Sequence, residues 1–243
     1  MSVRAVGALE EILRLPDQAL VRLLDRPRSD QAQPGPDLRC LNGFTDPMRP
    51  LNDCLDRLPG SQAHDIDFIA RQDRANLDAE GRVAVVRSRI VIRPRHDGVD
   101  RYFLRLFGNE GSSIDKVRVE LLEHCRLGRV VRHFSESVMV AELRFDHVLR
   151  AGETWVFEYE VSDPTGKSST DYAHEVRGFE EHCLVEVRFH PDRLPVGCYS
   201  FIQRGPDDEP ERTADLALNK AHAVHHVETA VAAGWVGIGW SWG

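Results

Sequence analysis

The sequence predicts a mainly β protein, an antiparallel immunoglobulin-like β-sandwich preceded by a short helical segment at its N-terminus. From about residue 64 onward, apolar and polar residues alternate with a period of two, as in strands with one buried face. Turn signals recur between these stretches at intervals typical of a sandwich. No long helical period separates them, which argues against parallel βαβ units. A barrel of similar strand number would show the same periodicity and stays an alternative.

Residues 1–28 form the helical segment of this prediction. Apolar residues fall on one helical stripe in each half, and Pro16 stands where a second helix would begin. Two helices this short cannot bury their own apolar faces. We therefore expect them to dock on a partner surface.

Residues 29–63 are predicted to form a linker and a short helix. The stretch from Pro27 to Asp37 is polar and rich in proline, which is typical of a linker. A helix is expected from about Leu51 to Leu58, ended by Pro59 and Gly60. We expect this segment to pack loosely on the domain formed by residues 64–243.

Three stretches of that domain show the strand pattern most clearly. Each places apolar side chains on one face and mostly polar ones on the other: Met139 to Phe145, Trp155 to Val161 and Cys183 to Phe189. The segment from Leu149 to Glu153 is predicted to be a tight reversal, and Gly197 and Gly234 indicate others.

An arginine-rich stretch is the first candidate site. Arg87, Arg89, Arg93 and Arg95 share one strand face, and the turn HDGVD predicts a hairpin that returns through Arg101 and Arg105. Guanidinium groups suit phosphate and carboxylate, so a contact with an anion or a nucleic acid is one interpretation. We favour the other, a solvated sheet face balanced by acidic side chains on neighbouring strands.

The histidines near residue 224 and the C-terminal tryptophans are the next candidates. On a strand, His222 and His226 would lie roughly 13 Å apart, too far to bind one ion, so no metal site is predicted there. Trp235 shares a strand face with Gly237 and Gly239, where small residues would let a backbone or a planar ligand approach. Trp235, His222 and His226 are therefore candidate ligand contacts. The alternatives are a surface histidine cluster and tryptophans that fill the core.

No pattern indicates a catalytic residue. Gly166-Lys167-Ser168 lacks the glycine that a phosphate-binding loop places five positions before its second glycine, because Val161 stands there. This stretch is predicted to be a polar loop. The five cysteines show no CxxC spacing, which favours reduced, mostly buried thiols. We expect no enzymatic activity and no cofactor.

The net charge of −8 argues against the whole chain being a nucleic-acid binder, because such affinity requires a basic surface. No apolar run is long enough to span a bilayer, and Glu10 and Glu11 argue against a signal peptide. A soluble cytoplasmic protein without a membrane partner is expected.

The segment AVGALEEILRLPDQALVRLLDRPR, residues 5–28, resembles the last helix and exit of XRE-type helix-turn-helix domains in transcription regulators of high-GC bacteria. Downstream, ARQDRANLDAEGRVAVVRSRIVIRPRHDGVDRYFL, LRAGETWVFEYEV and GWVGIGWSW are similar to the β-rich carboxy-terminal domain of the same regulators. The chain departs from that pattern because the earlier helices, including the recognition helix, are not in it.

The resemblance implies that residues 64–243 are the effector-sensing or self-association half of a regulator, without enzymatic activity. Its expected partners are a second copy of the chain and a small-molecule effector. DNA should bind only weakly unless an N-terminal reading domain is restored. The alternative is a stand-alone β-sandwich module that binds another protein.

Overall fold

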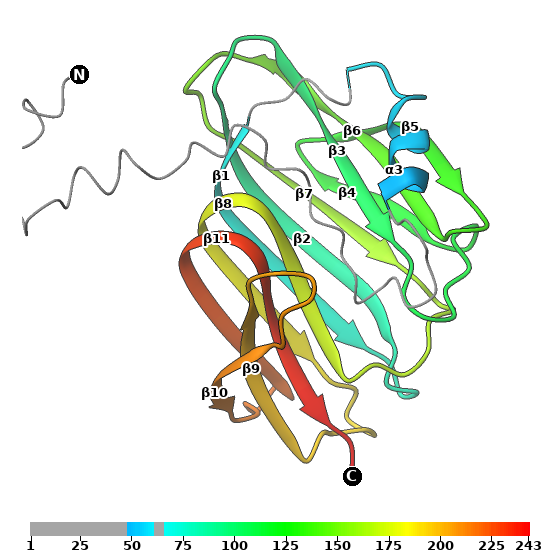
Figure 1. Ribbon diagram of the computed structural model, residues 1–243, viewed down its shortest axis with the longest axis vertical. Coiled ribbons are helices and arrows are strands. Elements are labelled where there is room, and N and C mark those ends of the chain that lie inside the picture. The colour runs from blue at the N-terminus through cyan, green and yellow to red at the C-terminus, as the bar shows by residue number, and fades with distance from the viewer. Residues whose placement is uncertain (1–47, 61–65) are drawn as a thin grey trace, which may run out of the picture. The chain divides into compact units, whose positions relative to one another are not determined.

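The computed structural model describes residues 48–60 and 66–243, which form one helix and eleven strands (Figure 1). The predicted helices within residues 1–28 and most of the predicted linker lie outside the described residues. The elements are α3 (Met48–Leu55), β1 (Ile66–Leu77), β2 (Val83–Pro94), β3 (Val99–Phe107), β4 (Arg118–Glu123), β5 (Arg126–His133), β6 (Val138–Leu149), β7 (Trp155–Ser162), β8 (Asp171–Arg188), β9 (Gly197–Gln203), β10 (Glu211–Leu216) and β11 (Ala223–Ser241). Among the described residues, no helix combines the length and apolar character that crossing a bilayer requires.

The strands form two sheets that do not close on themselves. The larger has the order β10-β9-β11-β8-β1-β2-β7-β4, and the smaller has the order β3-β6-β5. The prediction of a mainly β fold is confirmed. One departure matters for the site: β1 and β8 pair in parallel, whereas the other paired strands are antiparallel.

The first core lies between the small sheet and β2 and β7. Its residues are the apolar members of the alternating strand patterns: Met139, Ala141 and Leu143 of β6 and Phe157 of β7 are all fully buried. Strands of period two present every second side chain to one face, so apolar residues on facing strands form a continuous layer.

The second core lies among β8, β9 and β11. Val185 and Val187 of β8 pack with Val236, Ile238 and Trp240 of β11. The reversal predicted at Gly234 is wrong, because this glycine lies inside β11, at an irregularity in its pairing with β8. A φ of +147° strains any residue with a side chain, and the Gln203 carbonyl leaves no space for one. These two constraints account for the glycine at this position, and no chain reversal is needed.

The predicted arginine hairpin is also wrong. The turn at Gly98 is present, but β2 pairs with β1 and β7 while β3 pairs with β6 in the other sheet. The physical reason is burial: Leu104 of β3 packs in the first core, so β3 covers the large sheet instead of extending it. Local turn chemistry indicates that the chain reverses, but not which sheet the next strand joins.

The helix α3 begins three residues before the predicted start and packs tightly. Leu51, Cys54, Leu55 and Leu58 are buried and form a third cluster with small-sheet residues that include Phe103. The expectation of loose packing is therefore wrong. The apolar residues recur at helical spacing and cover the small-sheet face opposite the first core.

Candidate functional site

A cavity of about 420 Å³ lies between β1, β2, β7 and β8 of the large sheet and β3 of the small sheet. Its lining combines aromatic and apolar side chains with many polar ones, including the charged residues where β1 meets β8. The lining side chains used below are Arg71, Asp73, Tyr102, Arg105, Leu106, Tyr159, Lys167, Ser168, Tyr172, His174, Arg177 and Glu180.

Three charged side chains form what we call the charged floor: Arg71, Asp73 and Glu180. They are 7%, 2% and 3% exposed. Arg71 and Asp73 are two residues apart on β1 and share its inward face with Ala75 and Leu77. Glu180 reaches them because the parallel pairing of β8 with β1 brings it beside Phe68.

The ion pairs within the floor are long. Arg71 Nη1 lies 3.7 Å from Asp73 Oδ1, and Arg71 Nε lies 3.6 Å from Glu180 Oε1. Both distances exceed the 2.7–3.2 Å range of a hydrogen bond between nitrogen and oxygen. The guanidinium balances the carboxylates without donating to these two oxygens.

Two residues at the start of β8 complete the network around the floor. His174 lies between the two carboxylates, with Nε2 3.0 Å from Glu180 Oε1 and Nδ1 3.5 Å from Asp73 Oδ2. The Tyr172 hydroxyl donates to Asp73 Oδ2 at 3.1 Å. Tyr102 of β3 accepts a hydrogen bond from Arg71 Nη2 at 3.4 Å, which connects the floor to the small sheet.

The electrostatics favour the charged forms of Glu180 and Arg71. Burial alone would raise the pKa of Glu180, but His174 and Arg71 outweigh it and hold that pKa below its usual value. Burial opposes the charge of Arg71, yet Asp73 and its other neighbours raise its pKa well above the usual value. Burial raises the pKa of Tyr172 and of Tyr159. Both phenols therefore stay protonated.

Three buried polar atoms of the floor have no hydrogen-bond partner among the described residues: Arg71 Nε, Asp73 Oδ1 and Glu180 Oε2. More than nine in ten buried polar groups in folded proteins are hydrogen-bonded, so three unsatisfied atoms in one cluster need an explanation. All three belong to side chains that line the cavity.

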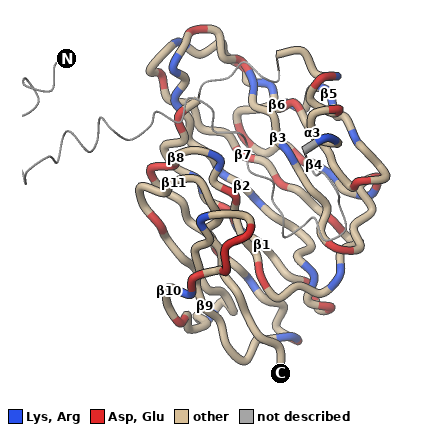
Figure 2. Tube along the Cα trace, viewed as in Figure 1, with Lys and Arg blue, Asp and Glu red and all other residues tan. Residues whose placement is uncertain are grey.

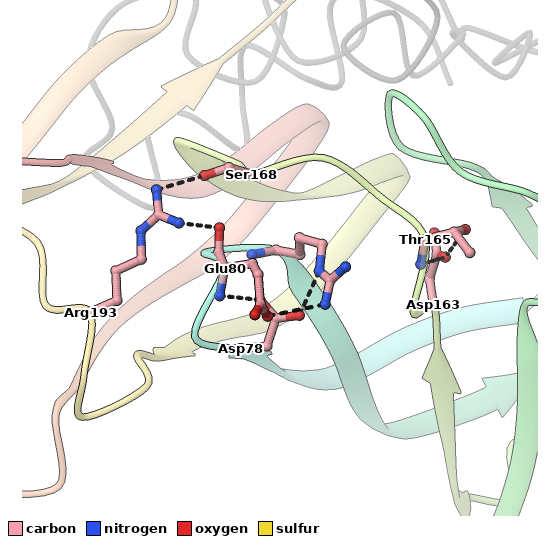
Figure 3. Close-up of polar contacts among 7 residues, drawn as sticks. Asp78, Glu80, Asp163, Thr165, Ser168 and Arg193 are labelled. Carbon is pink, nitrogen blue, oxygen red and sulfur yellow. Dashed lines mark hydrogen bonds and ion pairs between the residues drawn. The ribbon is translucent and has the colours of Figure 1, made fainter.

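A polar loop between β7 and β8 forms part of the cavity rim, as predicted for Gly166-Lys167-Ser168. Arg193 Nη2 donates to Ser168 Oγ at 3.2 Å, and Arg193 also donates to the Glu80 carbonyl in the β1–β2 turn (Figure 3). Asp163 accepts a hydrogen bond from the Thr165 amide at 2.9 Å. The Arg193 contacts join this loop to the β1–β2 turn, and the Asp163 contact braces the loop internally.

Most of the predicted arginines are paired with acidic side chains. Arg87 contacts Glu158; Arg89 lies 3.3 Å from both Glu123 and Glu158; Arg93 lies 3.9 Å from Glu181; Arg95 lies 2.6 Å from Asp67; and Arg101 contacts Asp100 and Glu142. Figure 2 shows basic and acidic positions interspersed along the strands. This pairing agrees with the favoured interpretation, a balanced sheet face.

Arg105 differs from the other predicted arginines. It lines the cavity, and no hydrogen bond or ion pair joins it to the rest of the described chain. Burial and the nearby guanidinium of Arg177 lower its pKa. It is the predicted anion contact that the structure brings to the cavity.

The other predicted ligand contacts lie elsewhere. His222 precedes β11 in a turn, His226 pairs with Glu228 at 2.9 Å, and neither lines the cavity. Trp235 is buried outside it, and its Nε1 has no hydrogen-bond partner within residues 48–60 and 66–243. The small residues beside Trp235 do accommodate planar groups, but these belong to the chain itself: Phe201 lies over Gly237 and Tyr199 over Gly239.

One set of potential metal ligands occurs among the described residues: His174, Glu180 and Cys183, whose ligand atoms lie within 4.8 Å of one another. The set does not fit a divalent ion well, because the Arg71 guanidinium already lies 3.6 Å from Glu180 and burial raises the pKa of the Cys183 thiol. Cys54, Cys125 and Cys198 are also free thiols. We assign no metal to this site.

The charged floor was missed at the sequence level. The available signal was two charged residues, Arg71 and Asp73, at inward positions of a strand whose other inward residues include Ala75 and Leu77. That pattern marks buried charges, which require partners. Their partner Glu180 is more than 100 residues away in the chain, and no local pattern identifies it.

A scan against protein-family models finds no match, and a search of curated proteins finds none either. Among solved structures, one described as a "putative protease" from Parabacteroides distasonis is 9% identical over 73% of this chain, with a TM-score of 0.46. Native yeast LTA4 hydrolase is 8% identical over 72% (TM-score 0.38), and its complex with bestatin is 7% identical over 72% (TM-score 0.36). The chain spans 40% of the first protein and 29% of the others.

The expectation that the chain is not an enzyme is corrected by this comparison, because the similar structures are named as a protease and a hydrolase. Because their TM-scores are below 0.5, the activities of those proteins are not assigned to this chain.

Proposed function

We propose that the β domain binds a small molecule in the cavity above the charged floor. The observation that carries this proposal is the cavity itself, which is lined by the three buried charged side chains Arg71, Asp73 and Glu180. Charged groups held in a cleft with few exposed atoms are candidates for a functional site.

The size and walls of the cavity support this proposal. Its volume of about 420 Å³ falls within the range of roughly 300–1,000 Å³ found for small-molecule sites. Such sites combine apolar and aromatic walls with a few well-placed polar groups. Here Tyr102, Tyr159 and Tyr172 supply aromatic walls, and the charged floor supplies polar groups.

The test compares the wild type with a variant whose cavity is filled. Leu106 is partly buried and lines the cavity, so Leu106→Trp should block it. A library of small aromatic amines, alcohols and acids is screened by ligand-observed NMR. We expect binders that Leu106→Trp abolishes and that Leu127→Trp, at an exposed position of β5, retains. Binders unaffected by Leu106→Trp, or none at all, would contradict the proposal.

In its biological setting, we propose that the domain is the effector-sensing or self-association half of a transcription regulator. This part of the proposal rests on the resemblance of residues 5–28 and of the β-rich region to XRE-type regulators. An in-frame helix-turn-helix coding segment directly upstream of Met1 in the genome would support it, and the lack of one would favour the stand-alone interaction module. The immunoglobulin-like arrangement also stays a prediction.

A further inference from the structure

Arg105 of β3 is a cation of the cavity lining that is not neutralised by the described residues. The other lysine and arginine side chains of the lining have acidic partners: Arg71 pairs with Asp73 and Glu180, Lys167 with Glu110, and Arg177 with Glu175. Arg105 makes no hydrogen bond or ion pair with another described residue. One positive charge in the lining is therefore left for a ligand to balance.

The donors of Arg105 are accessible. Its side chain is half-buried. The buried polar atoms that lack a hydrogen-bond partner among the described residues include Arg71 Nε but no nitrogen of Arg105. Since the Arg105 nitrogens have no such partner either, they must retain exposed surface. A guanidinium carries five N–H donors in one plane, and here these donors are free to reach a bound group.

The charge of Arg177 strengthens the preference for an anion at Arg105. Burial, and after it the repulsion from Arg177, lower the pKa of Arg105. Both side chains line the cavity. A bound anion would be attracted by both guanidinium groups, whereas a bound cation would add to the repulsion between them.

The carboxylates of the charged floor are the competing feature, because they would repel an anion. Asp73 and Glu180 are 2% and 3% exposed, however, and each is ion-paired with Arg71. They also belong to the large sheet, whereas Arg105 belongs to the small sheet. The accessible and unpaired charge of the lining is therefore the positive one.

We propose that the ligand of this cavity is a small organic carboxylate whose anionic group binds Arg105. This inference rests on the proposed function, because it assigns a chemical class to the ligand of the same cavity. A carboxylate carries the single negative charge that one unpaired guanidinium balances, and its two oxygens match the planar donor fork of arginine. An aromatic or aliphatic body attached to it would contact Leu106 and the tyrosines of the lining.

Three probes of similar shape and different charge test the inference: 3-phenylpropanoate, 2-phenylethanol and 2-phenylethylamine. Their affinities are measured with the full chain by following amide shifts in NMR titrations at neutral pH. We expect the acid to bind at least about tenfold more tightly than the alcohol, because its hydrogen bonds with a guanidinium are charge-assisted. The amine should bind most weakly.

The variant Arg105→Met assigns the preference to Arg105. It should lower the affinity for 3-phenylpropanoate about tenfold or more and leave the affinity for the alcohol nearly unchanged. Retained binding of the alcohol shows that the cavity of the variant is still folded. Arg126→Met is the matched control, because Arg126 belongs to the same sheet, lies outside the cavity lining and has a side chain that is 79% exposed. It should bind the acid as the wild type does.

The outcomes separate the two proposals. If the alcohol or the amine binds as tightly as the acid, and Leu106→Trp prevents that binding, the cavity binds small molecules but the assignment to carboxylates is wrong. If Leu106→Trp prevents the binding of no probe and of no compound in the library, the proposed function fails and the inference fails with it. An unchanged affinity for the acid in Arg105→Met, or an equal loss in Arg126→Met, would overturn the role of Arg105.

Discussion

Arg105 is half-buried, and its guanidinium makes no hydrogen bond or ion pair with another described residue. Burial and the charge of Arg177 lower its pKa, which means that the folded state disfavours the charged form. A charge held in this way costs stability, and natural proteins retain such groups mainly at functional sites.

Replacing Arg105 by methionine should therefore stabilise the domain. We expect Arg105→Met to raise the free energy of unfolding by about 1 kcal/mol and the melting temperature by about 2–4 °C. Thermal unfolding followed by circular dichroism measures the change. Arg93→Met is the control, because the Arg93 side chain is 42% exposed and lies 3.9 Å from Glu181, and the melting temperature of this variant should change little. A lower melting temperature for Arg105→Met would show that Arg105 has a stabilising partner.

Glu180 should make stability depend on acid pH. Its pKa is lower in the folded protein than its usual value, so the ionised group stabilises the fold above the unfolded value of about 4.3. This contribution is lost as the pH falls through the folded value. The urea midpoint of the wild type should drop between about pH 5 and pH 3, with a smaller drop in Glu180→Gln. Glu209→Gln, at an exposed position, should behave like the wild type. An equal drop in all three proteins would rule out this role of Glu180.

At the scale of elements, β11 shows how small residues let strands and rings approach. Gly237 and Gly239 alternate with Val236, Ile238 and Trp240, which fill the second core. A methyl group at Gly237 would lie 2.8 Å from the Tyr172 carbonyl and 2.9 Å from Ala173 Cβ, and closer still to the Phe201 ring. Because Phe201 is fully buried, this side chain cannot move away freely.

Gly237→Ala should consequently destabilise the domain. Overpacking of a buried position costs about 1–3 kcal/mol, which corresponds to a melting temperature lower by about 5 °C in a domain of this size. Gly178→Ala is a matched control in β8, because an added methyl group there meets nothing within 4 Å. Differential scanning calorimetry compares the two variants. Equal melting temperatures would show that Phe201 and β8 can adjust.

At the scale of the whole molecule, the described residues balance charge locally instead of gathering it into one basic surface. The net charge is −8, and most arginines of β2 and β3 pair with carboxylates of neighbouring strands. Binding to DNA gains free energy by releasing counterions from phosphates, which requires basic groups that are not already neutralised.

We therefore expect only weak, salt-sensitive binding of this chain to DNA. Fluorescence anisotropy with a labelled duplex at 50 mM and 200 mM salt should show an affinity that falls steeply with salt and differs little between sequences. A sequence-specific complex with a dissociation constant in the nanomolar range would contradict both this expectation and the charge argument.

Local patterns in the sequence determined the strands and their buried faces. Met139, Leu143, Phe157 and Val185 occupy the cores as their alternation predicts, because strand periodicity depends only on neighbouring residues. The polar loop at Gly166-Lys167-Ser168 was also predictable, because it too follows from the local sequence. The arginines of β2 pair with acidic side chains of neighbouring strands, as the favoured interpretation of the sequence expects.

Only the tertiary structure decided which strands pair and what lies between them. The parallel pairing of β1 with β8 brings Glu180 to Asp73 and Arg71. Strand β3 belongs to the small sheet, and its residues line the cavity opposite them. Pairing of distant strands depends on the packing of the whole chain, whereas periodicity records only which face of a strand is buried. The alternation of residues therefore identified the strands, and the site arose from the way they are joined.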